Sequence, residues 1–438
     1  MVYSAYWTVP FVGTLLSVAA LPVLAPAFWH KNSGKVFLFW SLLICAALGM
    51  SHSLPEFTTI VSDTMLSKFL PFIILIAALY IITGGIYFTV FSKVTATVNV
   101  VIVGIGALSA SWIGTTGAAM VMIRPLLRLN AERKYNTHLV IFFIFLVANI
   151  GGGVTPIGDP PLFVGFLSGV DFFWSLRHLS SAVYPVIFGM LGALYLVDSY
   201  LLKKEGCQFE HAGKTQIAVK GKRNILLLVV AVSSVMLSGV INIGAVEIFG
   251  ITLPIASLIR DLILLILSAV SLATTPKDIR RHNDFSFGPL KEVAELFVAI
   301  FLTLIPVEHI LHMGADGPFG PLFAWLSQGG ELSASKCFWL TGALSSVLDN
   351  APTYLTFFHL AGGDPNYFMN AGAHVLKAVS LGSVFFGALT YIGNAPNFMI
   401  KSIAQSYGYE MPSFFGYIKW SCAILLPIFA LVSVMIFQ

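Results

Sequence analysis

Two aspartates, Asp159 and Asp349, lie inside long apolar segments, where a charged side chain is costly and needs a partner or a function. Asp159 belongs to the stretch GGVTPIGDPPL at residues 152–162, and Asp349 is part of the stretch LDNAPT. Proline removes a backbone donor and glycine tolerates left-handed φ, so stretches of this kind interrupt a helix. The carbonyl groups freed by such a break could join a carboxylate in coordinating a hard cation.

Each aspartate could instead cap the half-helix that follows it, because aspartate is a favoured residue at the N-cap. For Asp159, which precedes Pro160 and Pro161, both interpretations remain open. For Asp349 we favour ion binding, because the matching position in the other half of the chain is Gly114. A repeated fold would therefore not require a carboxylate at this position.

The chain contains its helix-breaking stretch twice. GGVTPIGDPPL recurs as GALTYIGNAPN at residues 387–397, with five of eleven positions identical. Gly114-Thr115-Thr116 and Asp349-Asn350-Ala351 form a second pair at the same offset, since 393 − 158 and 350 − 115 both give 235. Two breaks at matching places in two halves are the best indication in a sequence of a transporter's binding site.

The composition excludes a soluble protein. Of 438 residues, 57% are hydrophobic and 10% are charged, whereas about 25% are charged in soluble domains. The four cysteines have no metal-binding spacing. The chain is therefore predicted to be a polytopic membrane protein.

Apolar runs of about 20 residues, enough to cross roughly 30 Å of hydrocarbon, divide the chain into two repeats. The first repeat, 1–202, is expected to contain three spans, a re-entrant hairpin at 97–127, a broken span at 137–169 and a span at 181–201. A cytoplasmic linker at 203–223 leads to the second repeat, 224–438, with three spans, a hairpin at 338–360, a broken span at 371–404 and a last span at 414–437. The spans that open the two repeats are expected at 6–29, 36–54, 69–89, 224–240, 250–272 and 293–311.

Each half then crosses the membrane five times, so the second half must insert upside down. The predicted fold class is an all-α polytopic membrane protein, an inverted-topology repeat of two five-crossing halves, each with a re-entrant hairpin and a broken transmembrane helix. Most lysines and arginines fall in loops on one side, which the positive-inside bias makes cytoplasmic. We therefore expect both termini to be periplasmic or extracellular, in the inner membrane of a bacterium.

The stretches NIGGGVTPIGDPPL and LDNAPT resemble motifs of the ion-transporter superfamily, most closely the branch of NhaD-type sodium/proton antiporters, arsenite permeases and citrate transporters. The resemblance covers almost the whole chain. It implies a scaffold domain that forms a homodimer and a transport domain that moves as an elevator.

The resemblance also implies two ion or substrate sites. The weaker one comprises Thr115, Thr116, Gly158 and Asp159, and the one we favour comprises Asp349, Asn350, Gly393 and Asn394. Thr155 and Thr390, at matching places in the two breaks, are added as further candidates. The first hairpin tip lacks the asparagine of the family pattern, which is why we favour the second site for Na⁺.

Three transport functions remain open, and the first two differ in the sign of the cargo's charge. Exchange of Na⁺ for H⁺ needs buried carboxylates that bind the metal when ionised and a proton when neutral. A cation-coupled citrate or dicarboxylate transporter must accept an anion near Asp159 and Asp349, which would repel it unless cations neutralised them. The third function is an arsenite or oxyacid permease. The aspartates therefore favour Na⁺/H⁺ antiport, with Na⁺ and H⁺ as transported ions and no cofactor.

A membrane-embedded enzyme is the non-transport alternative, and the sequence contains neither HExxH nor GxSxG. The expected partners are the lipid bilayer, a second copy of the chain and a small ion or carboxylate, with no nucleic acid.

Outside the motifs, Arg260 and Asp261 are adjacent in a span and favour an internal ion pair. Glu308, His309 and His312 close another span, where a histidine could sense pH or simply mark the membrane surface.

Overall fold

The computed structural model describes residues 3–206, 216–328 and 331–437, and this part of the chain is mostly helical. Within these ranges, eight helices are long and apolar enough to cross a membrane, judged by length and composition. Two shorter apolar helical segments, Thr137–Gly152 and Ala373–Leu389, lie in the first parts of the predicted broken spans 137–169 and 371–404. The chain is thus a helical polytopic membrane protein, while ten crossings and the inverted orientation stay predictions.

In the described residues of the first half there are nine α-helices and three short helical segments of other types. They are η1 (Ala5–Thr8), α1 (Val9–Leu24), α2 (Pro26–Ser51), α3 (Leu54–Asp63), η2 (Thr64–Phe69, a π-helix), α4 (Leu70–Thr83), α5 (Ala96–Ile113), α6 (Thr115–Leu129), α7 (Thr137–Leu146), η3 (Ile150–Gly152), α8 (Pro160–Leu167) and α9 (Phe172–Glu205). The second half contains α10 (Lys222–Ser238), α11 (Ile255–Thr274), α12 (Lys277–His282), α13 (Gly288–His312), η4 (Gly314–Asp316), α14 (Gly320–Leu326), α15 (Ala334–Ser345), α16 (Asn350–Leu360), α17 (Pro365–Met369), α18 (Ala373–Phe386), η5 (Gly387–Leu389), α19 (Ala395–Ser406) and α20 (Phe414–Phe437).

Within the described residues, three pairs of short antiparallel strands accompany the helices. β1 (Tyr87–Phe91) pairs with β2 (Gln216–Lys220), β3 (Ala245–Ile248) with β4 (Ile251–Pro254), and β5 (Ser327–Gln328) with β6 (Glu331–Leu332). Strands β1 and β4 occupy ends of the spans predicted at 69–89 and 250–272. Strand β2 lies in the predicted linker 203–223, of which residues 207–215 fall outside the described part of the chain.

Three helical segments begin well before their predicted starts. The continuous segment Leu54–Thr83, formed by α3, η2 and α4, starts fifteen residues before the span predicted at 69–89. Helix α2 starts at Pro26, ten residues before the predicted span at 36, and includes Lys31 and Lys35. Proline fits the first turn of a helix, since the amide hydrogen that it lacks has no intrahelical acceptor there. Helix α9 starts at Phe172, nine residues before the predicted start at 181, because the Asp171 side chain accepts a hydrogen bond from the Trp174 amide and caps the helix.

The two predicted hairpins correspond to pairs of packed helices. Helices α5 and α6 pack against each other and meet at Gly114, whose φ of 79° is strained for any other residue. Helices α15 and α16 also pack together, and the connection between them ends at Asp349. In both pairs the second helix begins at the predicted tip.

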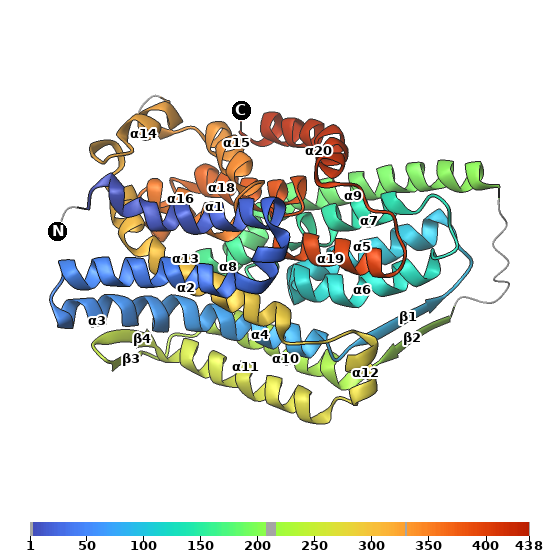
Figure 1. Cartoon of the computed structure of the whole chain (residues 1–438), viewed down its shortest axis with the longest axis horizontal. Helices are drawn as coiled ribbons and strands as arrows, with labels where there is room; N and C mark the ends of the chain where they lie inside the picture. Colours follow the sequence, from blue (N-terminus) through green and yellow to red (C-terminus); the bar gives the residue numbers. More distant parts are fainter. Residues whose placement is uncertain (1–2, 207–215, 329–330, 438) are drawn as a thin grey trace.

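Packing divides the helices into two groups (Figure 1). The flanking group comprises α1 to α4, α10, α11 and α13, and the site group comprises α5 to α9, α15, α16 and α18 to α20. In Figure 1, α10 and α11 run along the lower edge beside α4, while α5, α6, α7 and α9 gather at the right. The two groups meet where α13 packs on α16 and where α4 packs on α6.

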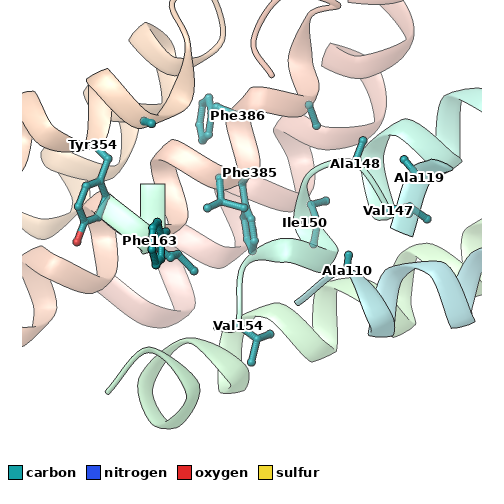
Figure 2. Close-up of a cluster of buried hydrophobic side chains, with 14 of the residues drawn as sticks. Ala110, Ala119, Val147, Ala148, Ile150, Val154, Phe163, Tyr354, Phe385 and Phe386 are labelled. Carbon is teal, nitrogen blue, oxygen red and sulfur yellow. The ribbon is translucent and has the colours of Figure 1, made fainter. Parts of the chain in front are cut away.

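Both halves of the chain build the core of the site group. Figure 2 shows Ile150 of the first broken segment beside Phe385 of α18, and both residues are buried, as is Val154. On α5 and α6, Ala110 and Ala119 are fully buried, and their small size lets the two helices approach closely. The irregular backbone of the breaks is therefore enclosed in protein, as the hydrocarbon of a membrane requires.

Candidate functional site

Four helices of the site group begin at the candidate site. Helix α6 starts at Thr115, α8 follows Asp159, α16 starts at Asn350, and α19 follows Asn394. A helix N-terminus carries unpaired amide hydrogens and a partial positive charge. The two breaks and the two hairpin tips thus direct four positive helix ends toward one place.

The Asp159 carboxylate joins these four helix ends. Its Oδ1 accepts hydrogen bonds from Thr115 Oγ1 and Asn394 Nδ2, both at 3.1 Å. Its Oδ2 accepts a hydrogen bond from Asn350 Nδ2 at 2.5 Å. All four side chains are buried, and Asp159 is 1% exposed. We call Thr115, Asp159, Asn350 and Asn394 the central cluster.

The central cluster takes the same two positions from each half. At the offset of 235 residues, Asp159 corresponds to Asn394 and Thr115 corresponds to Asn350. The sequence assigns these residues to two separate sites, one in each half. The structure brings them together in a single cluster at the junction of the halves.

The side chains of the two aspartates differ in their hydrogen-bond partners. Asp159 occupies the N-cap position of α8, but its carboxylate accepts hydrogen bonds from three other segments rather than from α8. The Asp349 side chain caps α16, accepting a hydrogen bond from the Ala351 amide at 3.2 Å. Asp349 is 7% exposed and lies in the wall of the adjoining cavity.

Two candidate threonines hold the backbone in place. Thr155 Oγ1 donates to the carbonyl of Ser111, and Thr390 Oγ1 donates to the carbonyl of Ser346 at 2.6 Å. Each bond fastens a break to the end of the helix pair in its own half. The amides of Ile392 and Gly393 donate to Thr390 Oγ1 as well, at 3.2 and 3.0 Å.

Gly158 and Gly393 are needed where two backbone segments approach each other. A methyl group on Gly158 would collide with the carbonyl oxygen of Gly152, and one on Gly393 would lie 2.7 Å from that of Gly387. The Gly158 carbonyl also accepts a hydrogen bond from the Thr115 amide at 2.9 Å. The glycines therefore allow the close packing that forms the central cluster.

Two further asparagines, not among the predicted site residues, support the central cluster. Asn149 Oδ1 accepts from Asn394 Nδ2 at 3.3 Å, and Asn149 Nδ2 donates to Asn397 Oδ1 at 2.8 Å. Asn397 Nδ2 in turn donates to the carbonyls of Gly387 and Thr390. These two residues could have been found from the sequence, because Asn149 and Asn397 are polar amides in apolar segments, at the edges of the repeated stretches.

A cavity of about 80 Å³ opens beside the central cluster, between the two helix groups. Volume of this size accommodates several water molecules. Phe72 of α4 and Phe297 of α13 form an apolar wall on the flanking side. The polar lining consists mainly of Thr115, Thr116, Asp159, Asp349 and Asn394. Among the lining residues in the described part of the chain there is no lysine or arginine.

This arrangement can stabilise charge of either sign. The helix ends favour an anion, as at many anion sites, whereas the two carboxylates favour a cation. Asn350 Oδ1 is buried and has no hydrogen-bond partner among the described residues, so it remains available to a cation or a donor. No group of three or more His, Cys, Asp or Glu residues in the described ranges could hold a metal, so a cation here would need neutral oxygen ligands.

Two of the ion-pair networks among the described residues concern pairs of charged side chains outside the cavity lining. Arg260 Nε donates to Asp261 Oδ1 at 2.8 Å, which is the internal pair that the sequence favours. A second network, absent from the sequence interpretation, joins Arg133 to Asp198 at 2.6 Å and to Glu205 at 3.3 Å. All three of these side chains are nearly inaccessible to solvent, so the network ties the loop after α6 to the end of α9.

The described residues contain eight candidate spans, and interrupted helices face each other around a buried carboxylate. These are features of a membrane transporter. A comparison with protein-family models gives the family. The model described as "Putative citrate transport" matches residues 2–437, so the chain belongs to this family. This agrees with the resemblance to the citrate-transporter branch of the ion-transporter superfamily. A search of curated proteins finds no match.

Proposed function

We propose that the protein is a secondary transporter that carries a citrate-like carboxylate together with a cation. The observation that carries this proposal is the meeting of four helix N-termini at a cavity lined by Asp159 and Asp349. The helix ends would face the carboxylate groups of the substrate. The two aspartates would hold the accompanying cation.

Electrostatics explains why the carboxylate would need a cation. Two like unit charges 4 Å apart repel each other by about 4 kcal/mol at an effective dielectric constant of 20. An anion with two or three negative charges would meet this repulsion from both aspartates, and the described lining offers it no basic side chain. A bound cation, or protons on the aspartates, would offset the repulsion. Membership of the citrate-transport family supports the carboxylate as cargo.

Exchange of Na⁺ for H⁺ is the second candidate. It is favoured by the unpartnered Asn350 Oδ1, which lies in the central cluster and could complete a set of oxygen ligands for Na⁺. In this case the cation alone would be cargo, and the helix ends would serve to hold the Asp159 carboxylate. The two candidates therefore differ in whether a carboxylate must be present for ion movement.

Alternating access would result from movement of the site group against the flanking group. The cavity lies between these groups, so a displacement of one against the other would change the side to which it opens. The flanking group would remain fixed and join a second copy of the chain in a homodimer. Exposed apolar side chains on α10 and α11, among them Leu226, Val229, Leu262 and Leu265, offer a surface for that contact or for lipid.

Uptake into proteoliposomes tests the proposal. Labelled citrate is added with NaCl, KCl or choline chloride, at two external pH values, while a dye inside reports proton movement. We expect citrate uptake above that of protein-free liposomes, and we expect it to depend on one of the cations or on the proton gradient. Proton movement driven by NaCl without citrate would instead favour Na⁺/H⁺ exchange, and no response to any of these solutes would contradict both candidates.

A further inference from the structure

A chain of polar side chains crosses the contact between the two helix groups, away from the cavity. Lys68 of η2 donates to both oxygens of Glu308 on α13, at 2.9 and 2.7 Å. His359, near the end of α16, places Nε2 3.1 Å from Glu308 Oε1. The His359 Nδ1 forms a hydrogen bond of 2.8 Å with His312 Nε2 on α13. We call these four residues the interface chain.

The interface chain leads from solvent to the interior. His312 is exposed, whereas His359 is 7% exposed and Glu308 is partly buried. Lys68, Glu308 and His312 belong to the flanking group, and His359 belongs to the site group. The contact would therefore break and reform if the two groups moved against each other.

The distances allow one arrangement of the protons. His359 Nε2 is buried, has no hydrogen-bond partner among the described residues and lies 3.1 Å from Glu308 Oε1. With the proton of neutral His359 on Nε2, its Nδ1 accepts a hydrogen bond from the Nε2–H of His312. A proton that binds to His312 Nδ1 from solvent can push the Nε2 proton of His312 onto His359 Nδ1. His312 is then neutral again, and His359 carries the positive charge beside Glu308.

We propose that the histidine pair His312–His359 binds one proton, and that this proton strengthens the contact of α16 with Glu308 and so favours the conformation described here. A protonated His359 forms a charge-assisted contact with Glu308 across the boundary of the groups. Movement of the site group would remove both Glu308 and His312 from His359 and release the proton. By linkage, acid shifts the population toward this conformation. The inference rests on the proposed function only in requiring that the site group moves.

The surrounding charges allow one proton and not two. Lys68 and His309 are the other basic groups near the pair, and the His309 ring lies 5.5 Å from that of Tyr3. Two charged histidines in contact would repel each other. Lysines of the other helices that pack on α16 have different partners: Lys336 donates to the Trp325 carbonyl and Lys377 to Ser181.

The loop after α16 closes over the pair. A methyl group on Gly363 would collide with His312 and lie 3.1 Å from His359 Nδ1, and Gly363 has a φ of 67°. The loop backbone therefore packs directly on the two rings. This packing keeps the histidines in the orientation that the proton transfer requires.

Two measurements on purified protein test the inference. The thermal midpoint in detergent is measured from pH 8 to pH 6, and citrate uptake is measured at the same external pH values. In the wild type, acid should raise the midpoint and change uptake roughly tenfold, a typical size for coupling between two sites. His359→Gln should lose the acid-dependent gain in midpoint and reduce the pH effect on uptake to about twofold or less. The matched control is His374→Gln, because His374 is exposed at the start of α18, and it should retain both effects.

The expected direction of the change in thermal midpoint follows from the preference of this conformation for the protonated histidine pair. The stabilisation is present in acid and is lost as pH rises. Glu308→Gln should flatten both pH dependences as His359→Gln does. If that variant does not accumulate because Lys68 is left unpaired, Lys68→Met combined with Glu308→Gln removes both charges. Wild-type pH dependence of the midpoint in His359→Gln would overturn the inference. The midpoint decides this even if citrate transport itself is absent, a result that would contradict only the proposed function.

Discussion

The two breaks of the chain share a backbone design but differ in charge at their equivalent positions. Asp159 and Asn394 are both N-cap residues of half-helices, and their side chains face each other across a hydrogen bond of 3.1 Å. Two carboxylates at this distance would repel each other, whereas a carboxylate and an amide form a hydrogen bond. The two halves thus repeat the same interrupted helix, and only one of the two equivalent N-cap positions carries a negative charge.

The hairpin tips show the opposite distribution. The second tip carries the carboxylate of Asp349, where the first has Gly114. Thr115 and Asn350, the next residues in each tip, both donate to Asp159, one with a hydroxyl and one with an amide. Each half therefore supplies one carboxylate, the first half from its break and the second half from its hairpin tip. The backbone arrangement is repeated in the two halves, whereas the positions of the charges are not.

Exchange of each aspartate for asparagine gives the sharpest test of this comparison. Asp159→Asn removes the charge that three donors share, and we expect citrate uptake to fall roughly 100-fold, since hydrogen bonds to a charged group contribute about 1.5–3 kcal/mol each. Asp349→Asn keeps a good N-cap, and uptake should fall less, roughly tenfold, through loss of charge at the cavity. Uptake assays on equal amounts of folded protein measure both. A larger loss of uptake in Asp349→Asn than in Asp159→Asn would instead favour the second half of the chain as the main ion site.

Substitution of alanine for Gly158 or for Gly393 compares how tightly the backbone is packed in the two breaks. We expect Gly158→Ala to lower the free energy of unfolding by about 3 kcal/mol and Gly393→Ala by about 1 kcal/mol, within the usual range for overpacking. The reason is that the new methyl group at residue 158 would collide with the Gly152 carbonyl, while at residue 393 it has more room. The thermal midpoints of the two variants check the order. Gly189→Ala is the control, because nothing lies within 4 Å of the added methyl group.

A double exchange moves the charge across the junction of the halves. Asp159→Asn with Asn394→Asp keeps one carboxylate and one amide at the two equivalent positions. We expect uptake about tenfold above that of Asp159→Asn alone, because the facing pair can still form its hydrogen bond, although Asn149 then faces a carboxylate. Uptake no better than in Asp159→Asn would mean that the location of the charge, and not only its presence, is essential.

Much of the fold and of the central cluster can be predicted from the repeat, but the spatial relation between its copies cannot. Thr115, Asp159, Asn350 and Asn394 are all recognisable, because a polar residue beside glycine and proline in an apolar segment marks a helix break. The offset of 235 residues shows that positions are equivalent, yet it does not show that the breaks face each other. That depends on the packing of α8 on α16 and of α19 on α6.

Side-chain direction is the second limit of the sequence. An aspartate before a helix can turn to its own backbone, as Asp349 does, or to another segment, as Asp159 does. Residue type is the same in both, so the choice depends on which donors tertiary packing brings near. The strand pair β1–β2 is unpredictable for a similar reason, because it joins segments that are more than one hundred residues apart.

The smallest effect is expected at Thr116, the second of the two threonines in the first hairpin tip. Thr115 donates to Asp159, so Thr115→Ala should reduce uptake roughly tenfold. Thr116 corresponds to Ala351 of the second half, where an alanine is accommodated at the same place in the helix start. Alanine is also the residue with the highest helix propensity, so Thr116→Ala should change uptake by less than about threefold. Because Thr116 lines the cavity, the same variant examines the first cation site that the resemblance implies. A tenfold loss of cation dependence in Thr116→Ala, with Thr115→Ala unaffected, would show that the hydroxyl of Thr116 binds the ion and that the two halves contribute separate sites after all.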